Sequence, residues 1–145
     1  MEEVTKSFFA RWNAASLDTS IAAIYPAGEF GSSKQNDSGT TEGVLLPRAE
    51  YTVANTAPDT KTRNSRIFKL PITVKCYSTS MSDVSGYLTS IRAKFVNSEG
   101  LMSMTGGTIL EVDEGAGFTH KTDDGNFMCQ IILVFRVRIG NALAV

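Results

Sequence analysis

The stretch NFMCQIILVFRVRI, residues 126–139, decides the fold because apolar and other side chains alternate along its whole length. Successive side chains of a strand point to opposite faces, so this stretch predicts one long β-strand. One face is wholly apolar, with Phe127, Cys129, Ile131, Leu133, Phe135, Val137 and Ile139.

The other face of this strand mixes Gln130, Arg136 and Arg138 with the apolar Met128, Ile132 and Val134. A face of mixed character suits a sheet that is covered by helices on one side and by a neighbouring subunit on the other. We therefore expect the subunit contact, or the wall of a lumen, to include Ile132, Val134, Arg136 and Arg138.

Immediately before this strand, residues 121–125 read KTDDG and end in Asp-Gly, which predicts a hairpin turn. The outgoing arm covers residues 104–118, in which Leu110 and Val112 are predicted to face inward. Gly115 and Gly117 are predicted to form a bulge or bend in this long hairpin.

Before the hairpin, the pattern of residues 83–96 predicts a helix. Ser80 or Ser82 is its expected N-cap, and Gly100 fits a C-terminal stop. Its apolar stripe has helical spacing and comprises Val84, Leu88, Ile91 and Phe95.

Two further strands are predicted, over residues 44–54 and 67–77. Pro47 marks the start or edge of the first, with Tyr51 and Val53 on one face. Pro71 suggests an edge position or a local irregularity in the second, because proline cannot donate to a ladder. The inward face of the second strand comprises Phe68, Leu70, Ile72, Val74 and Cys76.

The N-terminal residues 2–15 predict an amphipathic helix with the stripe Val4, Phe8, Trp12 and Ala15. Phe9 points away from that stripe and is a candidate for partner contact. Residues 17–25 predict a short second helix or a helical turn. Residues 31–43 and 55–65 predict two polar loops, and loops as long as the first are uncommon unless they have a function.

The predicted fold is a single α+β domain over residues 1–145, an antiparallel sheet with helices on one face, in the order α-β-β-α-β-β. Fourteen Lys and Arg balance fifteen Asp and Glu to a net charge of -1, which argues against a general nucleic-acid binder. No apolar run is long enough to cross a bilayer. The acidic N-terminus does not resemble a secretory signal.

Few residues suggest chemistry. His120 is the only histidine, and it lacks a paired His or Cys spacing for a metal. No serine lies in a GxSxG turn, so we expect no catalytic residue, no metal and no cofactor. Cys76 and Cys129 are expected as buried free thiols, with a disulfide between neighbouring strands as the alternative.

Basic residues gather around the second loop and the strand that follows it. They offer a solvated face, or a positive surface for an acidic partner or the edge of a DNA channel. The residues expected to face a partner are Lys61, Arg63 and Arg66, joined on the same strand by Lys69 and Lys75.

In this order of elements, the chain resembles the tail-terminator proteins of tailed phages. The resemblance is carried by EEVTKSFFARW, LPRAEYTV, RIFKLPITVKCYS, SDVSGYLTSIRAKFV and NFMCQIILVFRVRI, which together span most of the chain. It implies a virion protein, assembled in the host cytoplasm, that forms a ring, commonly a hexamer. The implied partners are the tail-tube protein and a neck or connector protein, with a passing contact to DNA in the lumen and none to a membrane.

Two other interpretations of the sequence remain. One is a neck, head-completion or tail-tube protein of a phage particle, to which the long 31–43 loop also points. The other is a small cytoplasmic enzyme or ligand-binding domain, whose pocket would draw on Tyr51, Tyr77 and His120. Oligomeric state separates these classes, because a tail terminator and a neck, head-completion or tail-tube protein must assemble, whereas an enzyme or ligand-binding domain need not.

Overall fold

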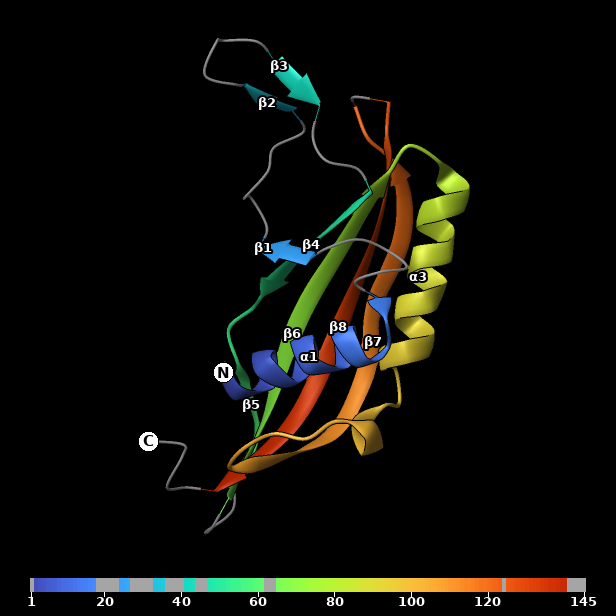
Figure 1. Cartoon of the computed structure of the whole chain (residues 1–145). Coiled ribbons are helices and arrows are strands. Elements are labelled where there is room, and N and C mark those ends of the chain that lie inside the picture. The colour runs from blue at the N-terminus through green and yellow to red at the C-terminus, as the bar shows by residue number, and fades with distance from the viewer. Residues whose placement is uncertain are drawn as a thin grey trace.

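The computed structural model describes residues 2–17, 24–26, 33–35, 41–43, 47–61, 65–123 and 125–140. Its main sheet has the strand order β1-β4-β6-β8-β7, and β5 also pairs with β6 (Figure 1). The bounds of these strands are β1 Ile24–Pro26, β4 Arg48–Val53, β5 Ala57–Lys61, β6 Ser65–Ser78, β7 Gly107–Lys121 and β8 Phe127–Gly140.

The helices are α1 Glu2–Ala14 and α3 Met81–Phe95, with a short 3-10 turn at Glu99–Leu101. All pairings in the main sheet are antiparallel except that of β1 with β4, which is parallel. This confirms the α+β fold with an antiparallel sheet and helices packed on it. In Figure 1, α1 crosses the strands while α3 runs along β7 and β8.

The core lies between the two helices and one face of the sheet, and Phe8 of α1 is at its centre. The Phe8 ring centroid lies 5.2 Å from that of Phe95 on α3 and 6.4 Å from that of Phe135 on β8. Phe8 and Phe135 are fully buried, as the alternation in β8 predicts. Both helices therefore cover the same face of the sheet.

Helix α3 begins where its cap predicts, since the Ser80 side chain accepts a hydrogen bond from the Asp83 N–H at 3.2 Å. Its predicted stripe is buried, and the helix ends at Phe95. The prediction of Gly100 as the stop is wrong. Asn97 takes the left-handed conformation instead, with φ of 61°, a region that asparagine enters more readily than most residues.

Pro71 does not lie on an edge strand, because β6 pairs with β8 along its whole length. On its other side, β4 ends with Val53 opposite Ile72, and β5 begins with Ala57 opposite Lys69. The Pro71 carbonyl accepts from the Ala54 N–H at 3.0 Å in that gap. Pro71, which has no N–H to donate, therefore lies in the gap between the end of β4 and the start of β5.

The β7–β8 hairpin is confirmed, with two register shifts in β7. The shift between Glu114 and Gly117 confirms the predicted bulge. The other, between Ile109 and Glu111, makes Leu110 the extra residue, so the prediction that Leu110 faces inward is wrong. Ile109 and Val112 are the buried pair.

Three predicted segments differ from the structure. The helix predicted for residues 17–25 does not reach its end as expected, because Ile24–Pro26 is strand β1 beside β4, and residues 18–23 lie outside the described residues. The polar loop 55–65 contains strand β5, which pairs with β6. Within residues 31–43, β2 Ser33–Gln35 and β3 Thr41–Gly43 pair with each other in a separate two-stranded sheet.

Two side-chain predictions are also settled. Phe9 is not left for a partner, because it packs edge-on against Tyr51 with ring centroids 5.0 Å apart. Cys76 and Cys129 lie directly opposite each other on β6 and β8 and are free, buried thiols. A hydrogen bond with Cys129, together with burial, raises the pKa of Cys76.

Candidate interaction surface on the open face of the sheet

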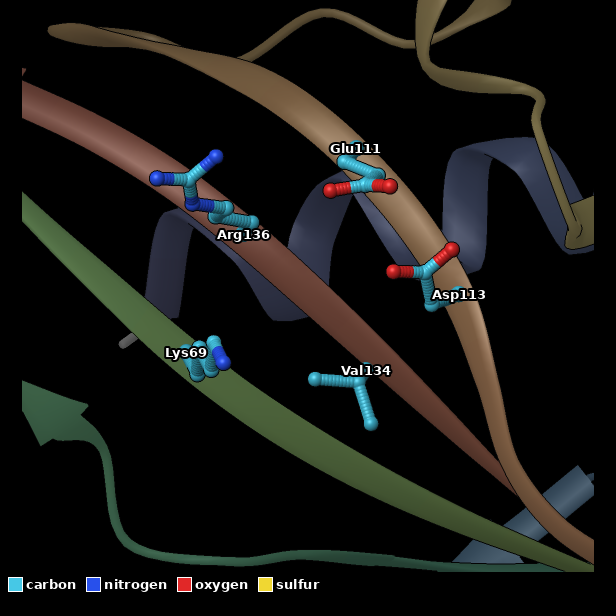
Figure 2. Close-up of a pocket in the computed structure, with 5 residues that line it drawn as sticks. All are labelled: Lys69, Glu111, Asp113, Val134 and Arg136. Atoms are coloured by element: carbon cyan, nitrogen blue, oxygen red, sulfur yellow. The ribbon is translucent and has the colours of Figure 1, made fainter. Parts of the chain in front are cut away.

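The sheet face opposite the two helices is here called the open face. Figure 2 shows part of it, with α1 on the far side of the strands. Its side chains on the three long strands are half-buried or exposed, in contrast to the buried residues that alternate with them. They include Lys69, Pro71, Thr73, Lys75 and Tyr77 of β6, Met128, Gln130, Ile132, Val134, Arg136 and Arg138 of β8, and Glu111, Asp113, Phe118 and His120 of β7.

One end of the open face is charged. Lys69 of β6, Arg136 of β8 and Glu111 of β7 form a single row across three strands, and Asp113 lies opposite Val134 in the next row. These five residues line a hollow of about 390 Å³ (Figure 2). Charged groups surround the hollow and one valine forms its apolar part, as in the rim of an interface.

The other end of the open face is aromatic. The guanidinium of Arg48 lies 4.2 Å from the ring centroid of Tyr77, and its Nε donates to the Glu50 carboxylate at 3.2 Å. This ion pair is buried, with side chains 5% and 7% exposed. Phe118, opposite Gln130, is 46% exposed, one of the most exposed large apolar side chains among the described residues. This end therefore presents the half-buried ring of Tyr77 and the exposed ring of Phe118, while Arg48 lies buried behind Tyr77.

All four residues predicted for the subunit contact lie on the open face. Ile132, Val134 and Arg136 are half-buried, and Arg138 is exposed. Strands β6 and β7 flank them on either side, and no described helix packs over them (Figure 1). In the described part of the chain, this flank of β8 is therefore half-buried to exposed and carries no helix over it.

The residues predicted to face a partner are only partly brought together. Lys61 and Arg66 are opposite each other on β5 and β6, and Arg63 lies outside the described residues. Arg66 is half-buried, with its guanidinium 4.8 Å from the Phe68 ring centroid. Because Arg66 shares the side of β6 with buried Phe68, it does not join Lys69 and Arg138 on the open face.

The residues considered for a ligand pocket do not converge. Tyr51 faces the helices and packs on Phe8 and Phe9, whereas Tyr77 and His120 are on the open face. His120 is exposed and lies opposite Met128. Among the described residues, no group of three His, Cys, Asp or Glu side chains is placed to hold a metal ion.

Sequence reasoning missed two parts of this surface. It did not single out Glu111 and Asp113, although their alternation with Val112 already placed them on one face. It also missed the buried Arg48–Glu50 pair, for which the sequence holds no signal beyond the i, i+2 spacing. The strand register, which only the fold supplies, was needed to align Glu111 with Arg136 and Lys69 and to pair Arg48 with Tyr77.

The fold resembles that of a protein from a solved particle. A chain of a structure described as the virion of a native gene transfer agent (GTA) particle matches with a TM-score of 0.62. The two chains are 14% identical, and the match covers 96% of each. Sequence identity this low shows a shared fold, and the coverage shows that the fold is shared over almost the whole chain.

The other comparisons found nothing similar: no protein-family model matches the chain, and no curated protein matches it. In the described part of the chain, no helix has both the length and the apolar character that a membrane span requires.

Proposed function

We propose that this chain is a structural protein of a phage-like virion that acts as a tail terminator. It closes into a ring on the end of the tail tube and presents its opposite side to the head or neck. The observation that carries the proposal is the shared fold with a chain of a GTA virion over 96% of both chains. The element order that resembles tail terminators supports the finer assignment.

The open face supports assembly for a physical reason. Its middle is apolar, with Pro71, Ile132 and Val134 in adjacent rows of β6 and β8. An apolar strip of this kind gains free energy when another surface removes it from water. The charges at one end would fix the orientation of the partner, because opposite charges confer specificity more than affinity.

The proposed mechanism is geometric. A ring built from head-to-tail contacts closes by rotation, so no contact surface remains for further lateral growth. Once seated, the ring covers the exposed end of the tail tube and removes the template for the next tube ring. The proposed partners are therefore further copies of this chain, the tail-tube protein and a neck or connector protein, and the proposed location is the virion.

The test is the mass of the purified full chain in native mass spectrometry, followed by imaging of the particles. We expect one discrete ring species, a hexamer by resemblance to tail terminators. A long helical polymer would instead indicate a tail-tube subunit. A monomer whose melting temperature rises with a small ligand would overturn the assembly role in favour of a ligand-binding domain.

A further inference from the structure

Three rows of side chains cross the open face at its charged end. In each row the residues are direct neighbours on β6, β8 and β7. In that order, the rows are Ile67–Arg138–Thr108, Lys69–Arg136–Glu111 and Pro71–Val134–Asp113.

The charges do not balance within each row, although two cations and two carboxylates line the hollow as a whole. Lys69 and Arg136 are directly opposite each other, a pairing of like charges that destabilises a sheet. Glu111 of β7 is the other neighbour of Arg136, and its negative charge offsets that of Arg136 but not that of Lys69. Lys69 and Arg138 therefore leave a positive surplus over β6 and β8, while Asp113, opposite the uncharged Val134, leaves a negative surplus on β7.

The acidic residues also lie at an edge. Strand β7 is the last strand of the main sheet, and Asp113 is exposed there. Register shifts flank the segment on both sides, between Ile109 and Glu111 and between Glu114 and Gly117. Bulges make an edge a poor template for another strand, so side chains rather than a continued ladder are left to make contact.

We propose that a second copy of this chain seats the acidic edge of its β7, around Asp113, on the basic part of the open face formed by Lys69 and Arg138. The proposal rests on the ring assembly proposed above and names the two surfaces that meet. Because the donor and acceptor surfaces differ, each copy keeps its own acidic edge for the next copy. Contacts of this kind run head to tail, and they close as a ring when the rotation from one copy to the next divides a full turn.

The hollow beside Lys69 fits this docking. Its lining holds both charge types, and it opens on the same face as the basic residues (Figure 2). A carboxylate of the neighbour that approaches Lys69 also relieves the repulsion between Lys69 and Arg136. The docking thus removes an unfavourable pairing present in the single copy.

The experiment uses the full chain with Lys69→Glu and, separately, Asp113→Lys, each compared with the unaltered chain in native mass spectrometry over a range of concentrations. We expect each variant to need a concentration at least about tenfold higher for half-assembly, because like charges then meet across the contact. An equimolar mixture of the two variants should assemble again. In that mixture, the carboxylate introduced at position 69 of one variant meets the ammonium group introduced at position 113 of the other.

A second measurement separates docking from folding. Lys69→Glu removes the like-charge pair with Arg136, so the single copy should unfold at the same or a higher urea concentration while assembly weakens. The matched control is Lys94→Glu, a reversal at an exposed site on α3, which should assemble like the unaltered chain.

The outcomes that overturn this docking differ from those that overturn the ring. If the unaltered chain forms rings and both charge variants do too at unchanged concentration, the docking is wrong and the ring stands. A closed two-copy complex would also overturn the head-to-tail contact. If the unaltered chain stays a monomer at all concentrations, the ring and the docking fail together.

Discussion

Glu114 shows how one residue connects the helical layer to the sheet. Its carboxylate accepts two hydrogen bonds from the Arg92 guanidinium of α3, from Nε and from one terminal nitrogen, each at 2.7 Å. The hydrogen bond with Arg92 is the main cause that lowers the pKa of Glu114 below its ordinary value. This paired geometry is the strong form of an Arg–carboxylate contact, although water screens it here.

The lowered pKa of Glu114 predicts a pH-dependent contribution to stability. The folded chain holds the Glu114 proton less tightly than the unfolded chain, so the contribution is present above the ordinary pKa of 4.5 and is lost as pH falls below it. We expect Glu114→Gln to lower the urea midpoint slightly at pH 7, and this difference to shrink progressively as pH falls below 4.5. A difference that stays the same size as the pH is lowered would show that the effect comes from packing.

At the scale of elements, Gly86 of α3 and Gly107 of β7 differ in whether a larger side chain would fit in their place. An added Cβ at Gly86, in the exposed side of α3, would have no atom within 4 Å. At Gly107, the first residue of β7, it would lie 2.5 Å from the Arg138 carbonyl oxygen and 2.9 Å from Cγ2 of Ile139. A backbone atom cannot move aside as a side chain can, so the hairpin start has room only for glycine.

This contrast predicts opposite signs for the same substitution. Gly86→Ala should raise the free energy of unfolding by about 0.5–1 kcal/mol, because alanine loses less backbone entropy in a helix. Gly107→Ala should lower it by about 1–3 kcal/mol through overpacking. Urea unfolding of both variants, at a concentration below assembly, measures the two changes. A stable Gly107→Ala chain would show that β7 does not start against β8 as described.

At the scale of the whole molecule, β8 divides the protein into a helix-covered side and an open side. Leu133 and Val134 are successive residues on these two sides, and Leu133 is completely buried while Val134 is half-buried beside Asp113. The same substitution at the two positions therefore tests which side is core and which side is available for assembly.

We expect Leu133→Lys to prevent stable folding, with a loss of about 4 kcal/mol or more, because it buries an unpaired charge. Val134→Lys should leave the far-ultraviolet circular dichroism and the unfolding midpoint of the single copy nearly unchanged, since the new ammonium group can meet Asp113. It should shift the half-assembly concentration upward in native mass spectrometry. Normal assembly of Val134→Lys would remove the open face from the subunit contact.

Much of this architecture follows from local patterns in the chain. The alternation of β8, the stripe of α3 with its Ser80 cap, and the stripe of α1 each encode an element and its buried side. A strand or an amphipathic helix has a fixed period, so the sequence alone shows which side chains must leave water. The mixed second side of β8 was predictable for the same reason.

Only the tertiary structure decided which charges share a surface. Lys69 and Glu111 are far apart in the sequence, and Arg136 brings them into one row because β6 and β7 both pair with β8 in a particular register. The bulge at Leu110 shifts that register by one residue, and a shift of one residue moves every later side chain to the other face. Local patterns therefore determined the elements and their buried sides, whereas the placement of the charges depended on non-local pairing, which no local period encodes.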